Sequence, residues 1–180
     1  KYLANSDSHE LAYEQFNSTN CMTDRMASFE TLIRNHNPYL DEVIKCIYNE
    51  FMDDKQVIDM WFSYQSLSPL TTPSRVEELI GHRLFSIKNP NRVRSLIGAF
   101  TQNHHQFHCR DGYRLFGEFI LELDSINPQV ASRLVGVFNL WKKYTSNYSE
   151  LQRKELETIR ASKNLSNNVF EIVNISLEGE

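Results

Sequence analysis

Hydrophobic positions repeat along most of the chain with the spacing of an α-helix. The clearest case is the segment 89–100, where the apolar side chains fall at i, i+3, i+4 and i+7. Asn89 is a good N-cap residue and Pro90 suits the first helical position, where an N–H group is not needed. The pattern therefore predicts a helix whose apolar face carries Arg92 on one flank and Arg94 on the other. The apolar positions are Val93, Leu96, Ile97 and Phe100.

The same spacing predicts helices along the rest of the chain, over about residues 9–16, 23–34, 40–51, 57–67, 73–81, 113–123, 127–144, 149–161 and 166–175. The segment 101–111 is polar, rich in histidine, and predicts a loop. All five prolines lie at a helix start or in the linker before one. No strand pattern competes, and helices joined by short turns pack as antiparallel pairs. We therefore expect an all-α fold, an irregular superhelix of antiparallel helix pairs, similar to armadillo or HEAT solenoids.

Composition narrows the possible functions of the chain. Its 180 residues, 41% of them hydrophobic, are enough for one domain over residues 1–180 with a sizeable core. The net charge of −4 argues against nucleic acid as a partner, which would require a concentrated basic surface. No apolar run is long enough for a membrane span, so we expect no membrane partner. Cys21, Cys46 and Cys109 suggest reduced thiols and a cytoplasmic location.

Several longer sequence motifs point to one family. They are the twelve residues 89–100, Phe107-His108, the eight residues 127–134, Cys21–Met26, Met60–Phe62 and Glu171–Ile172. Together they resemble the C-terminal helical domain of bacterial aminopeptidase N enzymes, which are zinc peptidases of the M1 family. The resemblance covers most of the chain, and it implies a helical superhelix that follows a catalytic domain in a longer polypeptide.

The chemistry of such a peptidase is missing from this chain. A zinc peptidase of this class needs H-E-x-x-H on a helix, so that two imidazoles bind the metal and the glutamate acts as base. The only His-Glu pair is His9-Glu10, and Tyr13 stands where the second histidine would be. We therefore expect no catalytic residue, no metal ligand and no cofactor in this chain, which should be inactive alone. The resemblance implies that zinc lies in the catalytic domain of the parent enzyme.

Histidines cluster in the loop 104–109. His104 and His108 are four residues apart and Cys109 follows, a set that offers ligands for a metal. The spacing fixes no fourth ligand in a loop, so we favour a polar connector in which His108 makes a local hydrogen bond. His36 and His82 stand near helix ends, where a cation would complement the helix dipole.

Three polar residues are candidates for the functional surface. Gln129 and Arg133 are four positions apart and therefore share one helix face. In the family that this chain resembles, the residues matching Arg94, Gln129 and Arg133 face an internal cavity near the far end of a bound peptide. The alternative is that they form hydrogen bonds between helices. Gly98 and Gly136, both inside predicted helices, are expected to allow close helix packing.

Two functions follow from this reading. The first is a non-catalytic domain that covers the active site of a zinc aminopeptidase, limits access to it and helps to position peptides for removal of N-terminal residues. Its partners would be the catalytic domain of the same polypeptide and peptide substrates. The alternative is a freestanding helical-repeat module that binds a protein or peptide on its concave face.

Overall fold

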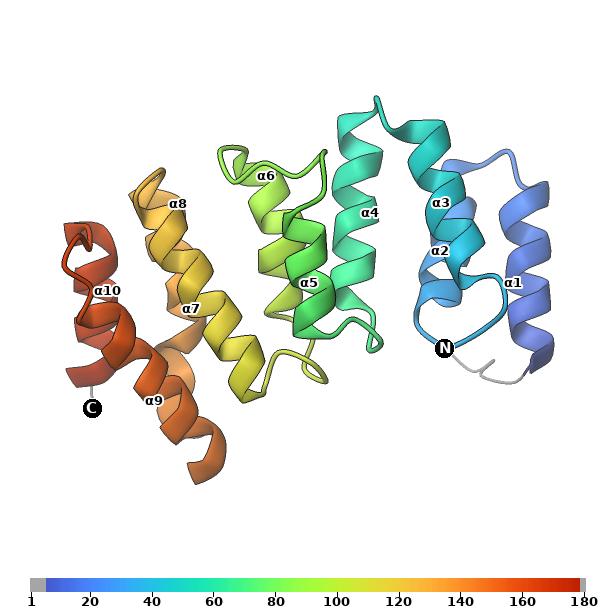
Figure 1. Cartoon of the computed structure of the whole chain (residues 1–180). Coiled ribbons are helices and arrows are strands. Elements are labelled where there is room, and N and C mark those ends of the chain that lie inside the picture. The colour runs from blue at the N-terminus through green and yellow to red at the C-terminus, as the bar shows by residue number, and fades with distance from the viewer. Residues whose placement is uncertain (1–5, 179–180) are drawn as a thin grey trace.

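The structure is a computed structural model that describes residues 6–178. The predicted domain 1–180 also includes residues 1–5 and 179–180, which lie outside this described part. Within residues 6–178 every regular element is a helix (Figure 1). The elements are α1 (Ser6–Ser18), α2 (Met22–Ile33), α3 (Leu40–Phe51), α4 (Lys55–Leu67), α5 (Pro73–Ile80), α6 (Pro90–Val93), η1 (Arg94–Gly98), α7 (Arg110–Asp124), α8 (Pro128–Val135), η2 (Gly136–Lys143), α9 (Ser146–Arg160) and α10 (Asn167–Glu178).

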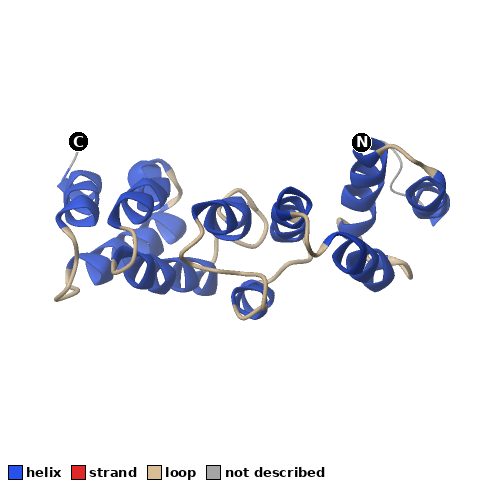
Figure 2. Cartoon of the chain, turned by 90° about the horizontal axis from the view of Figure 1, so that it is seen from above, coloured by secondary structure: helices blue, strands red, loops and turns tan. Residues whose placement is uncertain are grey.

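The helices form two rows along a shallow curve, as Figure 2 shows. The outer row contains α3, α5, α7 and α9, which face the viewer in Figure 1. The inner row contains α2, α4, α6 with η1, α8 and α10, and it lines the concave side. This arrangement confirms the prediction of an all-α superhelix of helix pairs.

Local capping explains why the helices begin where they do. The side chain of Asn89 accepts hydrogen bonds from the backbone N–H groups of Asn91 and Arg92, and Pro90 occupies the first helical position, as expected. Asp54 caps α4, and Thr72 caps α5 in the same way. These polar caps satisfy backbone donors that have no partner inside the helix.

The predicted helix 127–144 is one continuous helical segment, but its pitch changes. It is α-helical to Val135 and then continues as the 3₁₀-helix η2 from Gly136 to Lys143. The first turn is capped by Asn127, whose side chain accepts a hydrogen bond from the N–H of Val130. Within this 3₁₀ segment Leu140 is 55% exposed, whereas Phe138 is fully buried.

The core is built around Phe107, which is fully buried at the end of the 101–109 loop. Its ring contacts Phe100, Phe116 and Phe138 at centroid distances of 5.6, 5.5 and 6.4 Å. Tyr113 of α7 also packs on it edge to face. Three helical segments therefore converge on one aromatic residue: the segment that contains η1, α7 and η2.

Close packing at glycine occurs at different positions from those predicted. A methyl group on Gly98 would meet its nearest neighbours at 3.8 and 3.9 Å, which is ordinary contact, and one on Gly136 would meet only Asn139 of the same segment. The expectation that these two glycines permit close packing is therefore wrong. The close approaches are at Gly112, where a methyl group would lie 2.3 Å from the backbone oxygen of Phe107, and at Gly117.

Candidate functional site

The two arginines of the segment 89–100 have different environments. Arg92 is 6% exposed and donates from Nη1 to the backbone oxygen of Lys55 and to the carboxylate of Asp59, while its Nε donates to the oxygen of Leu84. Its guanidinium also lies 5.6 Å from the ring centre of Phe62. Arg92 is therefore a structural residue that joins α4 to the segment before α6.

Arg94, by contrast, is exposed. It begins the π-helical turn η1, in which the N–H of Ala99 bonds to the oxygen of Arg94, five residues earlier. Such single-turn insertions are uncommon in helices and are frequent at functional sites. The apolar face predicted for this helix is nonetheless preserved, because Leu96 and Ile97 are buried inside the π turn.

Arg94 and the last turn of α8 lie on neighbouring helices of the inner row. A methyl group on Gly98 would lie 3.8 Å from Cβ of Arg94 and 3.9 Å from Cδ2 of Leu134. Leu134 adjoins Arg133, so the turn that carries Arg94 packs against the turn that carries Arg133. Gln129 is one helical turn before Arg133 on the same face of α8.

The side chains of Arg94, Gln129 and Arg133 are exposed and make no hydrogen bond or ion pair with the residues that the structure describes. They are therefore free to contact a ligand or another part of a longer polypeptide. These three residues are called here the arginine surface, and the elements that carry them, η1 and α8, belong to the inner row (Figure 2).

The histidine-rich loop forms a hydrogen-bonded chain. Nδ1 of His104 lies 3.4 Å from Nε2 of His108, and Nδ1 of His108 lies 2.7 Å from the hydroxyl of Tyr113, as expected for a hydrogen-bonding His108. Nε2 of Gln152 donates to the same hydroxyl at 3.0 Å. Burial and the neighbouring His104 lower the pKa of His108, which favours the neutral ring that this network needs.

A zinc ion has no suitable ligand set in the described part of the chain. No group of three or more histidine, cysteine, aspartate or glutamate side chains lies close enough together there to hold a metal ion. Cys109 is used otherwise, because its sulfur caps α7 by accepting from the N–H of Gly112.

His82 differs from its predicted role. Burial, followed by the charges of Arg83 and Arg75, lowers the pKa of His82, which favours the neutral ring over the cation expected at the end of α5. Instead it packs between the rings of Tyr48, Trp61 and Phe62, and its Nδ1 accepts from the N–H of Leu84.

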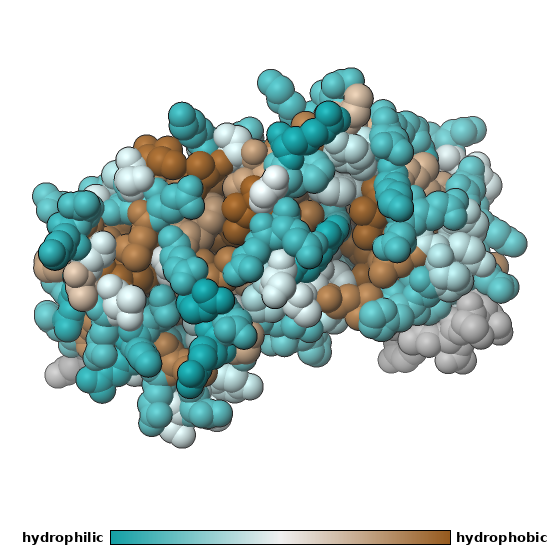
Figure 3. Space-filling view, viewed as in Figure 1, coloured by the Kyte–Doolittle hydropathy of each residue, from teal (hydrophilic) through white to brown (hydrophobic). Residues whose placement is uncertain are grey.

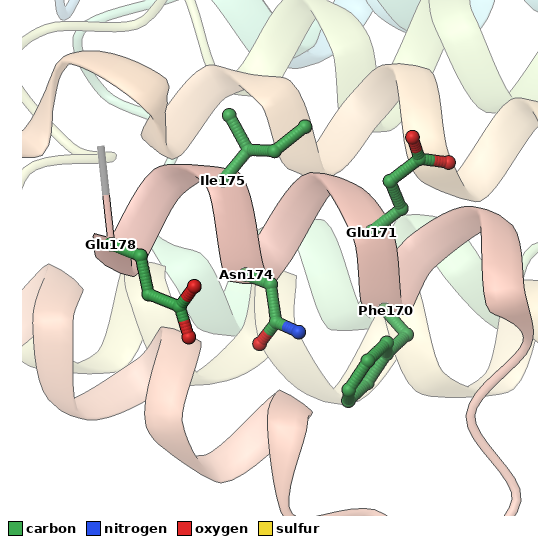
Figure 4. A pocket seen from close by; sticks show the side chains of 5 residues that line it. All are labelled: Phe170, Glu171, Asn174, Ile175 and Glu178. Carbon is green, nitrogen blue, oxygen red and sulfur yellow. The ribbon is translucent and has the colours of Figure 1, made fainter.

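An open hollow of about 540 Å³ runs along α10. Figure 4 shows that its five side chains straddle this one helix, with Glu171 and Ile175 on one side and Phe170, Asn174 and Glu178 on the other. Phe170 and Ile175 are 44% and 59% exposed. Because a single helix supplies every side chain, the hollow has no opposing wall and is an exposed face rather than a binding cavity.

Comparison with known proteins decides the family. A family model described as a domain of unknown function (DUF3458_C) with ARM repeats matches residues 1–178. The chain belongs to this family. Its ARM-repeat description agrees with the two rows of helices seen here.

Related proteins confirm the resemblance to the helical domain of aminopeptidase N enzymes. The chain is 35% identical to aminopeptidase N of Escherichia coli and 30% identical to that of Haemophilus influenzae, in each case over 98% of its length. It superposes with a TM-score of 0.88 on Legionella pneumophila aminopeptidase A, crystallised with aspartic acid, at 29% identity. That match covers 94% of this chain and 20% of the Legionella chain. The chain thus spans about a fifth of the length of these relatives.

Within residues 6–178 no helix is both long and apolar enough to cross a membrane.

The role of Arg94, Gln129 and Arg133 remains a prediction from the sequence, whereas the structural role of Arg92 was missed by sequence reasoning. The partner that defines that role, Asp59, lies 33 residues earlier in another helix, so no local pattern connects the two.

Proposed function

We propose that this chain is the non-catalytic C-terminal domain of a cytoplasmic M1 zinc aminopeptidase, and that it covers the active site of the parent enzyme. The observation that carries the proposal is the similarity to aminopeptidases along nearly the whole chain. Zinc and the residues that cleave the peptide bond belong to the catalytic domain of the same polypeptide. This chain limits access to the active site and helps to position peptides for removal of their N-terminal residues.

The arginine surface supports this role. Arg94 and Arg133 are exposed, are carried by helices of the inner row and have no acidic partner among the described residues, so they present two unneutralised positive charges. A guanidinium binds a carboxylate through two parallel hydrogen bonds. Arg133 therefore binds the C-terminal carboxylate or a carbonyl of a short peptide whose N-terminus lies at the zinc. Gln129, which offers both donors and an acceptor, contacts the peptide backbone.

The alternative is a freestanding module that binds a protein or peptide on its concave face. The continuous inner row of helices supports this possibility. The alternative does not account for relatives in which the matching segment is only about a fifth of a longer enzyme.

The experiment is to sequence the complete polypeptide and to assay it beside the 180-residue chain. The proposal expects H-E-x-x-H and a downstream glutamate before residue 1, zinc bound to the complete protein, and release of N-terminal amino acids from peptides. The 180-residue chain should neither hydrolyse aminoacyl substrates nor keep stoichiometric zinc after dialysis. A natural start codon at Lys1, or one tightly bound zinc per chain that is lost on replacing His104 and His108, would refute the proposal.

A further inference from the structure

A groove crosses the outer row between α3 and the pair α4–α5. It consists of two adjoining hollows of about 330 and 380 Å³. Asp41, Ile44 and Arg75 line both hollows, so the two form one continuous groove. In Figure 3, which views this convex face, apolar surface is visible in the hollow between α3 and α5. The inner row that carries the arginine surface is on the opposite side.

The floor of the groove is apolar and held in place by hydrogen bonds between helices. Nε1 of Trp61 donates to the backbone oxygen of Ile44 at 3.0 Å, which ties α4 to α3. The hydroxyl of Ser68 donates to the oxygen of Ile33 at 2.6 Å, which ties the end of α4 to α2. The groove is therefore formed before any ligand arrives, as most small-molecule sites are. Its apolar lining consists of Ile33, Leu40, Ile44, Tyr48, Trp61 and Leu70.

Opposite charges stand on the two walls. Asp41, on α3, makes no hydrogen bond or ion pair with the described residues. Arg75, on α5, donates to Oε1 of Gln65 at 3.3 Å and to Glu78 at 2.6 Å. Lys45 lies one turn beyond Asp41 and lines only the second hollow. Arg75 is ion-paired with Glu78, but this pair is exposed and its guanidinium has further donors. A ligand with an ammonium and a carboxylate group can therefore use Asp41 and Arg75 at once, whereas a ligand with one charge can use only one of them.

We propose that this groove binds a short apolar peptide with free termini. Its ammonium group contacts Asp41, its carboxylate contacts Arg75, and its side chains lie on the apolar floor near Ile44 and Trp61. The two hollows, of about 330 and 380 Å³, have the size of small-molecule sites, which typically measure about 300–1,000 Å³. The site is separate from the arginine surface and does not depend on a catalytic domain.

The two tryptophans make the test specific. Trp61 lies in the groove, whereas Trp141 lies in η2 and donates its indole N–H to Ser176. In a two-dimensional ¹H–¹⁵N spectrum of the 180-residue chain, each indole N–H gives its own resonance. Titration with the tripeptide Leu-Leu-Leu should shift the Trp61 resonance to saturation and leave that of Trp141 in place.

Blocked peptides and matched variants assign the charges. Asp41→Asn should weaken binding of Leu-Leu-Leu roughly fivefold to tenfold, since one partly exposed ion pair is lost. The N-acetylated peptide already binds less tightly, and Asp41→Asn should leave its affinity unchanged. Arg75→Gln should weaken binding of the free peptide by a similar factor and should leave binding of its C-terminal amide unchanged. The controls are Asp53→Asn and Arg153→Gln, exposed residues outside the groove, which should bind like the unchanged chain.

Three results would overturn the proposal. The first is a Trp61 resonance that does not shift at about 10 mM peptide, a concentration far above any useful dissociation constant. The second is equal affinity for the free and the doubly blocked peptide. The third is that the control variants weaken peptide binding as much as Asp41→Asn and Arg75→Gln do. Circular dichroism and thermal melting of every variant show whether the fold is kept. Failure here leaves the covering role untouched, because that role is tested in the complete enzyme and on the opposite face.

Discussion

Arg92 is paired with Asp59 inside the molecule, whereas Arg94, two residues later, has no partner among the described residues. The side chain of Arg92 is 8% exposed and that of Asp59 is 23% exposed. Removing one member of such a pair leaves the other charge partly buried without compensation, which is far more costly than losing an exposed charge. One short segment thus contains a residue that holds helices together and a residue available for binding.

The first prediction concerns these two arginines. Arg92→Ala should lower the free energy of unfolding by about 3 kcal/mol, because Asp59 and two backbone oxygens lose their donor. Arg94→Ala should change it by less than about 0.5 kcal/mol. Urea denaturation of both variants measures the difference. Equal effects would show that the pair with Asp59 contributes little to stability.

The second prediction concerns two glycines in or next to helices. Gly112→Ala should destabilise the chain by about 2 kcal/mol or more, since the new methyl group would lie 2.3 Å from the backbone oxygen of Phe107, and backbone cannot move cheaply. Gly98→Ala should be neutral or stabilising by up to about 1 kcal/mol, because its methyl group meets nothing closer than 3.8 Å. The melting temperatures of the two variants provide the measurement. A lower melting temperature for Gly98→Ala than for the unchanged chain would contradict the contact distances at Gly98.

The third prediction is a pH dependence at Glu155. Burial, and then the charge of Glu118, raises the pKa of Glu155 to about 7, while Arg114 and Lys154 oppose the shift. The raised pKa means that the folded chain holds this proton more tightly than the unfolded chain. The stability from Glu155 is therefore present below about pH 4.5 and is lost as the pH rises to about 7.

The variant Glu155→Gln should remove this dependence and stabilise the chain at pH 8. Because the carboxylate is only partly buried, water screens the effect, and we expect about 1 kcal/mol. The matched control is Glu150→Gln, an exposed residue of the same helix. Denaturation between pH 4.5 and 8 provides the measurement. If Glu155→Gln keeps the pH profile of the unchanged chain, Glu155 does not titrate in this range.

The fourth prediction concerns the link between the histidine loop and α9. Tyr113→Phe should destabilise the chain by about 1–3 kcal/mol, since His108 and Gln152 both lose their partner at a buried site. The control Tyr148→Phe removes a hydroxyl from a 39%-exposed ring that also lies near His108. If the two variants melt at the same temperature, the buried hydrogen bonds do not stabilise the loop.

The pKa of His108 gives an independent check of the buried hydrogen bonds between His108, Tyr113 and Gln152. Its lowered pKa means that the unfolded chain takes up a proton first as the pH falls, so this residue's stabilising contribution is present above about pH 6.5 and lost below it. A titration of the imidazole resonances by NMR should therefore place the His108 midpoint below 6.5. A midpoint above 6.5 would contradict the buried, neutral ring.

The fold was largely predictable because its main signals are local. Apolar spacing at Leu96 and Ile97, and caps such as Asn89, act within one or two helical turns. What sequence reasoning missed depends on contacts between distant segments. Arg92 and Arg94 look alike until Asp59 is placed beside one of them, and the change of pitch at Gly136 follows from packing rather than from any motif.

The candidate sites also divide into those that local spacing predicts and those that depend on contacts between distant segments. Gln129 and Arg133 share a helix face by spacing alone, which made them candidates before the structure was known. The groove on the outer row escaped prediction because its walls come from α3 and α5 and its floor from α2 and α4. No single stretch of sequence combines Asp41, Ile44 and Arg75, so only the packing of helices brings these residues together.

The covering role is tested most directly by Arg133→Ala in the complete enzyme, with turnover of a tripeptide compared with that of a single-residue chromogenic substrate. Only the peptide extends far enough to reach Arg133, so its kcat/KM should fall roughly tenfold to a hundredfold. The small substrate should change by less than about twofold. Arg94→Ala should show the same trend more weakly, and the control Arg160→Ala, an exposed arginine of α9, should show none. Unchanged turnover of both substrates by Arg133→Ala, at an unchanged melting temperature, would contradict the account.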